Sequence, residues 1–276
     1  MSLRKKPRAD FVKAIDDDEK DRQLIGSLSR GLEILRAFEE SRGPLTNQDL
    51  VACTELPKST ISRITRTLTI EGFLTYLPAD GAYRLSPAVL GLARAFHDST
   101  GIAEAARSHM QELADAIRGT VALAARDRLD MVYMSICRGI SNVRVPQAPG
   151  TRIPITGSAI GNAYYHGVAA PERDMLTEMI KRKAQRNWPL IEQELERTGK
   201  DIAQYGFCVC AGTWNRDING VGVSLRLPDQ TVVAFNVGGP AFWLKEENLY
   251  EEIGPRLLAM SRNVLADLTR KSGLNR

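Results

Sequence analysis

The segment LPKSTISRITRTLTIEGF, residues 56–73, carries the signals of a single basic helix. Pro57 suits the first turn of a helix, because its missing N–H removes no intrahelical hydrogen bond there, and Gly72 supplies a stop just past the end. Apolar residues between them recur at three- and four-residue spacing and predict one buried stripe, made of Ile61, Ile64 and Leu68. The segment is therefore predicted to form an amphipathic helix.

The other side of this helix is expected to carry hydroxyl and guanidinium groups. Residues 57–70 contain no Asp or Glu, whereas Lys58, Arg63 and Arg66 are basic. Such a face suits phosphates and the acceptor edges of bases in a major groove. Taken alone, an ordinary solvated surface helix explains the same pattern, so the flanking segments decide between the two interpretations.

Two helices are predicted upstream. Ser27 or Ser29 is expected to cap the first, and a breaker at residues 43–44 ends it. Its apolar face is predicted to consist of Leu28, Leu32, Leu35 and Phe38. Thr46 and Asp49 have the spacing of a helix cap and open a second, short helix that stops before Pro57. The basic helix is thus the second member of a helix-turn-helix.

Downstream, residues 73–76 and 83–85 read as two strands joined by a turn at 78–81, which makes a candidate wing. Three helices followed by a hairpin indicate a winged helix-turn-helix. The residues expected to face the groove are Ser59, Thr60, Ser62, Arg63 and Arg66. Those expected nearer phosphate are Thr46, Lys58 and Arg84. The net charge of +4 permits nucleic-acid binding without requiring it, so this local patch matters more than the total.

Several segments resemble the IclR family of bacterial transcriptional regulators. The DNA-binding half of that family is resembled by SRGLEILRAF, LPKSTISRITRTL, EGFL and GAYRLSPAVLGLARAF. Its effector-binding half is resembled by GTRIPITGSAIGNAYYHG and by the stretch that ends in VVAFNVGGP. The resemblance covers almost the whole chain and implies an α+β protein with a winged helix-turn-helix, a linker helix and a GAF-like domain built on an antiparallel sheet.

The expected organisation has four parts: a disordered tail at 1–22, the DNA-binding domain at 23–86, the linker helix at 87–101, and an effector-binding and oligomerisation domain at 102–276. Apolar periodicity places helices in the last part at 102–117, 159–165, 172–182, 189–198 and 243–270, and strands at 121–125, 131–137, 143–145, 221–227 and 231–237. A basic arm that touches phosphate is the alternative for the tail, although its acidic cluster opposes this.

The resemblance also implies a pocket. One side would consist of Asn142, Val145, Ile153, Ala159 and Ile160, and the other of Cys210, Asn219, Asn236 and Gly238. Small hydroxyl residues are common in the family where Asn236 and Gly238 stand here, so the effector is left open. Small residues at 157–159 could bring backbone N–H groups to an anion or merely allow close packing. Arg144 and Arg152 could meet a carboxylate, and solvated surface explains them equally well.

The family's members bind palindromic double-stranded operator DNA as dimers or tetramers, and a small organic acid alters that binding. A cytoplasmic homo-oligomer acting as a repressor is therefore expected. Apolar residues of the linker at 89–96 occupy more than one face, which favours pairing with a second copy; packing on its own winged helix is the alternative.

We expect no enzyme, cofactor, metal or membrane span. The three histidines are far apart in sequence, and the chain has no nucleophile elbow, Walker loop, C-x-x-C pair or long apolar run. Cys208 and Cys210 are expected on opposite faces of a strand, as buried thiols or with one of them lining a cavity. The competing function is a small-molecule sensor or enzyme whose amino-terminal module binds protein.

Overall fold

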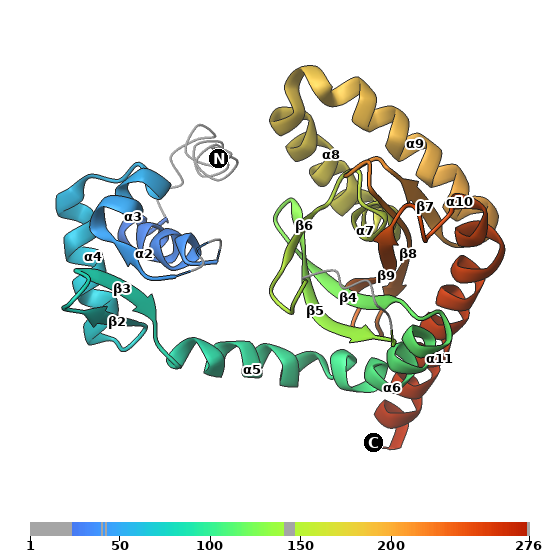
Figure 1. Ribbon diagram of the computed structural model, residues 1–276, viewed down its shortest axis with the longest axis horizontal. Helices are drawn as coiled ribbons and strands as arrows, with labels where there is room; N and C mark the ends of the chain where they lie inside the picture. Colours follow the sequence, from blue (N-terminus) through green and yellow to red (C-terminus); the bar gives the residue numbers. More distant parts are fainter. Residues whose placement is uncertain (1–23, 40, 42, 141–146, 275–276) are drawn as a thin grey trace. The chain divides into compact units, whose positions relative to one another are not determined.

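The computed structural model describes residues 24–39, 41, 43–140 and 147–274 of the chain. The chain divides into two compact units between Ser99 and Thr100 (Figure 1), and each is described here by itself. The expected tail at 1–22 and the expected strand at 143–145 lie outside the described residues.

The first unit is a winged helix-turn-helix. Its elements are α2 (Gly26–Ala37), β1 (Leu45–Thr46), α3 (Asn47–Thr54), α4 (Lys58–Ile70), β2 (Leu74–Leu77) and β3 (Ala82–Leu85). The strands form an antiparallel sheet in the order β1-β3-β2. Each of the three helices contributes one fully buried apolar side chain to the core, namely Ile34, Leu50 and Ile61, and β2 adds Leu74. The helix-turn-helix is thus fixed by a small shared core.

Two expectations about α2 are wrong. Ile25 occupies the N-cap without a side-chain cap bond, so Ser27 and Ser29 lie inside the helix. Leu28 and Leu32 are 58% and 49% exposed, because the face that packs on α3 and α4 is centred on Ile34 and Phe38. Leu35 and Phe38 do pack at the core as expected, whereas Leu28 and Leu32 do not.

The linker helix is α5 (Ala88–Thr100), which contains no buried residue. Its large apolar side chains Leu90, Leu92 and Phe96 are all exposed. Leu90 and Leu92 are therefore not packed against the winged helix-turn-helix of the same chain.

The second unit is built on one six-stranded antiparallel sheet, in the order β6-β5-β4-β9-β8-β7. The strands are β4 (Thr120–Asp127), β5 (Asp130–Arg138), β6 (Arg152–Pro154), β7 (Cys208–Ala211), β8 (Ile218–Arg226) and β9 (Val232–Pro240). The helices are α6 (Ile102–Ala116), α7 (Ala159–Gly167), α8 (Ala170–Ala184), α9 (Trp188–Tyr205), α10 (Glu246–Asn248) and α11 (Gly254–Leu274). A 3-10 turn, Gln185–Asn187, joins α8 to α9.

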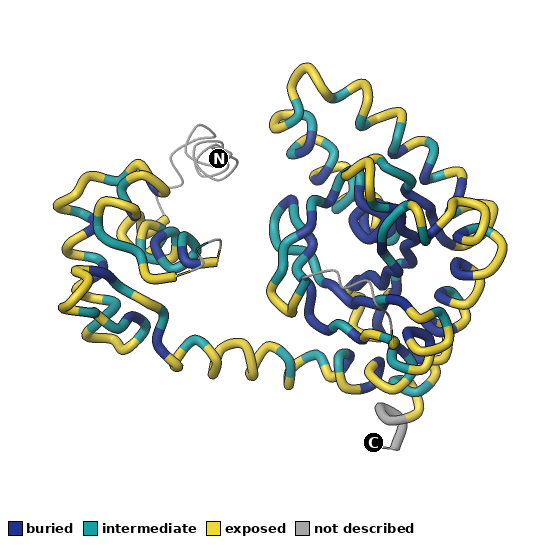
Figure 2. Tube along the Cα trace, in the orientation of Figure 1, coloured by how far each residue is buried: buried dark blue, intermediate teal, exposed yellow. Residues whose placement is uncertain are grey.

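Helices cover both faces of this sheet (Figure 1). One apolar core joins a face of the sheet to α6 and α11, and a second joins the other face to α7, α8 and α9. Figure 2 shows the buried residues concentrated in the strands and in α7, the helix that packs directly on the sheet. The α+β class expected for this half is confirmed.

The closing helix begins later than expected. Residues 241–244 form a turn, in which the N–H groups of Trp243 and Leu244 both donate to the carbonyl of Pro240. Helix starts only at Glu246, continues through a π-helical turn, Leu249–Ile253, and enters α11. The apolar residues at 243–244 therefore pack as a turn, although their spacing fits a helix.

Two glycines let α7 lie directly on the sheet. A Cβ added to Gly222 of β8 would stand 2.1 Å from the carbonyl oxygen of Ala159, and one on Gly161 would stand 2.2 Å from that of Ile155. No side chain larger than hydrogen fits either place without a backbone shift. The start of α7 is thus held against the middle of the sheet.

A half-buried histidine ties α7 to α9 and is expected to make stability depend on pH. His166 Nε2 lies 2.9 Å from the carbonyl oxygen of Leu195, and burial lowers the pKa of this histidine below 6.5. Below that pH the unfolded chain takes up a proton that the folded chain refuses, so stability should fall as pH drops from 7.5 toward 5. Thermal unfolding of the intact protein at several pH values measures this, and His166→Gln should reduce the fall; an undiminished fall would contradict the assignment to His166.

Candidate functional site

The basic helix α4 begins and ends where its punctuation predicts. Pro57 is the N-cap, and Gly72 has a φ of 77° just after the helix. The N–H of Phe73 donates to the carbonyl of Leu68 at 2.8 Å, which closes the helix with a bond of the Schellman type. Glycine at 72 is required because other residues reach this left-handed conformation only with strain.

One side of α4 is buried and the other is open. Ile61 and Thr65 are fully buried, and Ile64 and Leu68 are partly buried against the core. The opposite side presents exposed polar residues, namely Ser59, Ser62, Arg63 and Arg66, and Lys58 is exposed beside them. No salt bridge within the described part of the chain engages these three cations. The face is an uncompensated positive surface of the kind that meets phosphate.

The remaining predicted DNA-contacting residues differ in their exposure and in their hydrogen bonds within the protein. Arg84 on β3 of the wing is exposed, and Thr60 is half-buried on α4. Ser62 Oγ accepts a hydrogen bond from Asn47 Nδ2 at 3.4 Å, so it also ties α3 to α4. All eight predicted residues belong to the same unit; their contact with DNA stays a prediction.

Thr46 already has a structural role. Its hydroxyl accepts from the N–H of Asp49 at 3.2 Å, while Asp49 Oδ2 accepts from the Thr46 N–H at 2.9 Å and from its hydroxyl at 2.7 Å. These bonds form a reciprocal capping box and lower the pKa of Asp49.

Removal of this cap should be measurable. Thr46→Ala is expected to destabilise the amino-terminal unit by about 1 kcal/mol, since the N–H of Asp49 in the first turn of α3 loses its partner. Denaturant unfolding measures the change, and Thr46→Ser, which keeps the hydroxyl, is the matched control. Equal stability of the alanine and serine variants would show that the hydroxyl contributes nothing.

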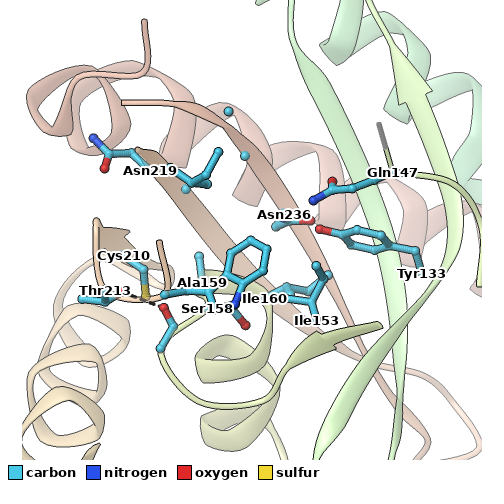
Figure 3. Close-up of a pocket in the computed structure, with 16 residues that line it drawn as sticks. Tyr133, Gln147, Ile153, Ser158, Ala159, Ile160, Cys210, Thr213, Asn219 and Asn236 are labelled. Carbon is cyan, nitrogen blue, oxygen red and sulfur yellow. Dashed lines mark hydrogen bonds between the residues drawn. The ribbon is translucent and has the colours of Figure 1, made fainter. Parts of the chain in front are cut away.

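The second unit contains a pocket beside the start of α7 (Figure 3). It holds about 470 Å³ of space between atoms, with open solvent at its mouth included. All seven described residues of the predicted effector site line it: Ile153, Ala159, Ile160, Cys210, Asn219, Asn236 and Gly238. Asn142 and Val145 lie outside the described residues. The structure thus brings together residues from both halves of the predicted set, and their binding of an effector stays a prediction.

One end of the pocket is the amino terminus of α7. Gly157 turns the chain with a φ of 75°, and Ser158 caps the helix by accepting from the N–H of Gly161 at 3.2 Å. The hydroxyl of Thr213 donates to the carbonyl of Gly157 at 2.6 Å and holds this turn. N–H groups of a first helical turn have no intrahelical partner, and Ala159 and Ile160, the first two residues of α7, line the pocket. This end therefore favours an anion.

The other end is polar but uncharged. Tyr133 of β5 and Asn236 of β9 point toward one another there, and Gln147 lies beside them (Figure 3). Burial raises the pKa of Tyr133 to about 12, and the Asn236 amide partly offsets that rise. None of the pocket residues that the structure describes carries a formal charge at neutral pH.

Arg152, a candidate partner for a carboxylate, is engaged elsewhere. Its guanidinium lies 2.7 Å from Asp127 and 3.0 Å from Asp130, and it does not line the pocket. The two aspartates flank the tight turn between β4 and β5, so the arginine holds β6 to that hairpin. Arg144 lies outside the described residues.

The expected placement of the two cysteines is wrong. Residues two positions apart on a strand share a face, and both thiols of β7 point to α7. Cys208 Sγ donates to the carbonyl of Ala159 at 3.5 Å, and Cys210 Sγ accepts from Asn162 Nδ2 at 3.4 Å. Cys208 is fully buried, and the Cys210 thiol together with that burial raises its pKa. Cys210 is the one that lines the pocket.

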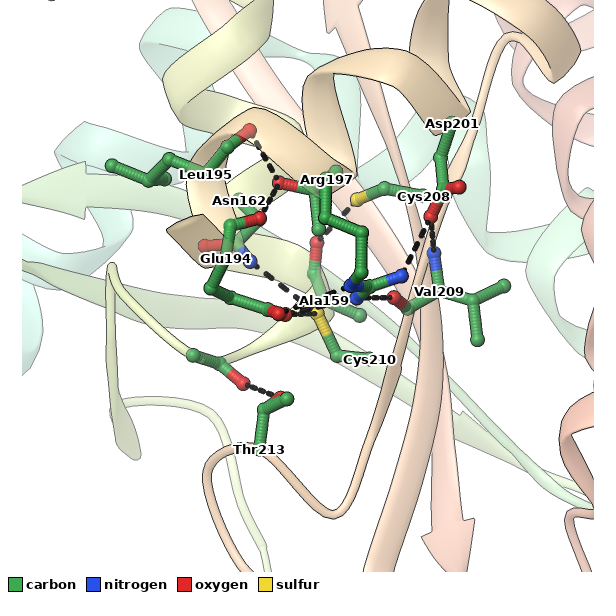
Figure 4. Close-up of polar contacts among 12 residues, drawn as sticks. Ala159, Asn162, Glu194, Leu195, Arg197, Asp201, Cys208, Val209, Cys210 and Thr213 are labelled. Carbon is green, nitrogen blue, oxygen red and sulfur yellow. Dashed lines mark hydrogen bonds and ion pairs between the residues drawn. The ribbon is translucent and has the colours of Figure 1, made fainter. Parts of the chain in front are cut away.

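A charged cluster behind Cys210 joins β7 to α9 (Figure 4). Arg197 contacts Glu194 at 2.9 Å and Asp201 at 3.1 Å, and donates to the carbonyl of Val209 at 2.6 Å. Asp201 accepts in turn from the N–H of Val209 at 3.3 Å. These contacts raise the pKa of Arg197, with the hydrogen bond to Glu194 as the largest cause. The cluster fixes the outer edge of the sheet next to the pocket.

Sequence reasoning missed part of the lining. Tyr133, Gln147 and Ile218 were not expected there, and the aromatic residue Trp214 also lines the pocket. Tyr133 carries no local signal, because it looks like any aromatic residue of a buried strand. Its role depends on the pairing of β5 with β4 and of β4 with β9, which brings it to Asn236.

The described residues contain neither a membrane-spanning helix nor a metal-binding cluster. No helix among them is long and apolar enough to cross a membrane. No cluster of three or more His, Cys, Asp or Glu residues within the same ranges could hold a metal ion.

Comparison with known proteins connects both units to one family. The IclR helix-turn-helix domain matches residues 27–78, and the bacterial transcriptional regulator IclR C-terminal domain matches residues 95–266. The HTH-type transcriptional regulator TsaQ1/TsaQ2 of Comamonas testosteroni is 31% identical over 264 residues, which cover 94% of this chain and 95% of that protein.

Solved structures agree. The crystal structure of an IclR family transcriptional regulator from Brucella abortus shares 39% identity with a TM-score of 0.81, covering 91% of this chain and 95% of the other. An IclR homolog from Microbacterium hydrocarbonoxydans, crystallised with 4-hydroxybenzoate, shares the fold at 18% identity and a TM-score of 0.70, covering 88% and 99%. With both domains matched in order, the chain belongs to the IclR family of bacterial transcriptional regulators and pairs a helix-turn-helix DNA-binding domain with an effector-binding domain.

Proposed function

We propose that this regulator reads operator DNA through the exposed face of α4 and responds to a small organic acid held at the start of α7. The observation that carries the DNA assignment is the acid-free surface of α4, where Arg63 and Arg66 stand exposed without an ion-pair partner in the described structure. In this proposal Ser59, Thr60 and Ser62 join them at the groove, and Thr46, Lys58 and Arg84 lie nearer phosphate.

An organic carboxylate suits the pocket better than a cation or a fully apolar molecule. The amino terminus of α7 supplies backbone donors and a partial positive charge, and Ile153 and Ile160 supply apolar surface. The homolog from Microbacterium hydrocarbonoxydans was crystallised with such an acid, 4-hydroxybenzoate.

We further propose a homodimer or tetramer. The exposed apolar residues of α5, above all Leu90, Leu92 and Phe96, would gain burial against a second copy. A two-fold assembly also fits a palindromic operator, since each copy then meets an equivalent half-site. We assign the protein to the cytoplasm, where the DNA is, and the direction of control to repression that the effector relieves.

The experiment that tests this proposal is binding of the purified protein to its own upstream intergenic DNA over a salt series, with and without a panel of organic acids. Selective binding should weaken with salt at a log-log slope of about −0.9 for each neutralised phosphate. A promoter–reporter fusion with and without the protein gives the direction of control. Absence of selective binding at every salt concentration would favour the alternative, a sensor whose first unit binds protein; the exposed α4 face and the family argue against it.

A further inference from the structure

A buried acceptor in the pocket lacks a partner. Asn236 of the central strand β9 is 9% exposed, and its Oδ1 is buried without a hydrogen bond from any residue that the structure describes. Leaving a buried polar atom unpaired is unfavourable, and such atoms in native proteins nearly always have a partner. Because Asn236 lines the pocket, a molecule that fills the pocket can supply the missing donor.

The Tyr133 hydroxyl stands beside this acceptor. Tyr133 is buried, and Figure 3 shows its hydroxyl directed to the same region as the Asn236 amide. The raised pKa, about 12, keeps the phenol protonated at neutral pH. This end of the pocket therefore offers one O–H donor and one unpaired carbonyl acceptor side by side.

We propose that the effector is a hydroxylated monocarboxylate, and that its hydroxyl group accepts from Tyr133 and donates to Asn236 Oδ1. This inference rests on the proposed function, which places the carboxylate at the start of α7. A hydroxyl group is the simplest group that both accepts and donates. Apolar residues Ile153 and Ile160 also line the pocket, so the body that joins the two polar ends should be apolar.

Other polar groups fit this end less well. An ammonium group could donate to Asn236 but could not accept from Tyr133, and the positive end of α7 would repel it. A second, ionised carboxylate could accept from Tyr133 but could not donate to Asn236 Oδ1. A methyl or methoxy group would displace water and leave the Asn236 acceptor unpaired.

Matched probes test this on the intact protein. Isothermal titration should compare 4-hydroxybenzoate, benzoate and 4-methoxybenzoate, and 5-hydroxypentanoate with pentanoate. In whichever series binds, aromatic or aliphatic, the hydroxylated acid should bind about 10- to 100-fold more tightly than the acids without a hydroxyl group, because only it satisfies the buried acceptor. Equal affinity of hydroxylated and unsubstituted acids would overturn the hydroxyl inference and leave the carboxylate assignment standing.

Substitutions of Tyr133 and Asn236 test whether these two residues recognise the hydroxyl group. Tyr133→Phe and Asn236→Leu should each reduce the preference for the hydroxylated acid to about 3-fold or less while binding of the unsubstituted acid persists. Tyr165→Phe is the matched control, since that buried tyrosine bonds Thr177 at 2.7 Å and lies outside the pocket lining. A preference that survives in Tyr133→Phe and Asn236→Leu would refute the two partners. If no acid binds or changes operator affinity, the proposed effector class fails, and this inference fails with it.

Discussion

Arg63→Ala is expected to weaken operator binding by about 10- to 100-fold while assembly of the oligomer stays unchanged. Arg63 lies at the middle of the exposed face of α4, between Ser59 and Arg66 on the same side of the helix. A bidentate arginine–guanine contact discriminates by about 1–3 kcal/mol, which is the origin of the expected loss. Fluorescence anisotropy with labelled operator measures it, and sedimentation checks assembly.

Two further variants make this result specific. Arg63→Lys keeps the charge but loses the fork geometry, so it should lose sequence discrimination and keep most of the salt dependence. Arg262→Ala removes an exposed arginine from α11 in the other unit and should leave operator affinity unchanged. If Arg63→Ala binds operator like the unaltered protein, Arg63 is not a DNA contact.

Gly222→Ala is expected to destabilise the effector-binding unit by about 1–3 kcal/mol and to weaken binding of the acid. The added methyl group would meet the backbone of Ala159, which cannot rotate away as a side chain can. The start of α7 would have to move away from β8, and the pocket residues Ala159 and Ile160 would move with it. Denaturant unfolding followed by circular dichroism measures the first effect, and titration with the acid measures the second.

Gly31→Ala provides the matched control. Gly31 lies in α2, where an added Cβ would meet only Ile64, at an ordinary 3.9 Å. Alanine is favoured over glycine in a helix, so this variant should be neutral or slightly stabilising. Loss of stability in both variants would mean that the Gly222 result does not report a collision specific to α7.

The basic helix could be predicted because its boundaries are local. Proline at one end, glycine at the other and the apolar spacing between them act within a few residues of chain, as does the Thr46–Asp49 cap. The face of α2 could not be read in the same way. Which of its apolar residues are buried depends on the angle at which α3 and α4 pack on it. Ile34 is buried, whereas Leu28 and Leu32 remain exposed.

In the pocket, too, some residues have a local sequence signal and others are placed only by the tertiary fold. The glycine-rich start of α7 has a local signal, and the family resemblance supplied Asn219, Asn236 and Gly238, which all line the cavity. Tyr133 could not be found from its neighbours in sequence, because strand pairing alone brings it to Asn236. The cysteines of β7 could have been placed correctly from strand geometry, since alternation by two assigns both to one face.

The cluster around Arg197 has a consequence for aggregation. β7 is the last strand of its sheet, and an outermost strand usually presents free N–H and C=O groups on which another chain can add a strand. Here Asp201 accepts from the N–H of Val209 and Arg197 donates to its carbonyl, so side chains of α9 occupy the positions that an incoming strand would need. These two side chains thus hinder the addition of another strand at this edge of the sheet, and self-association through it is disfavoured.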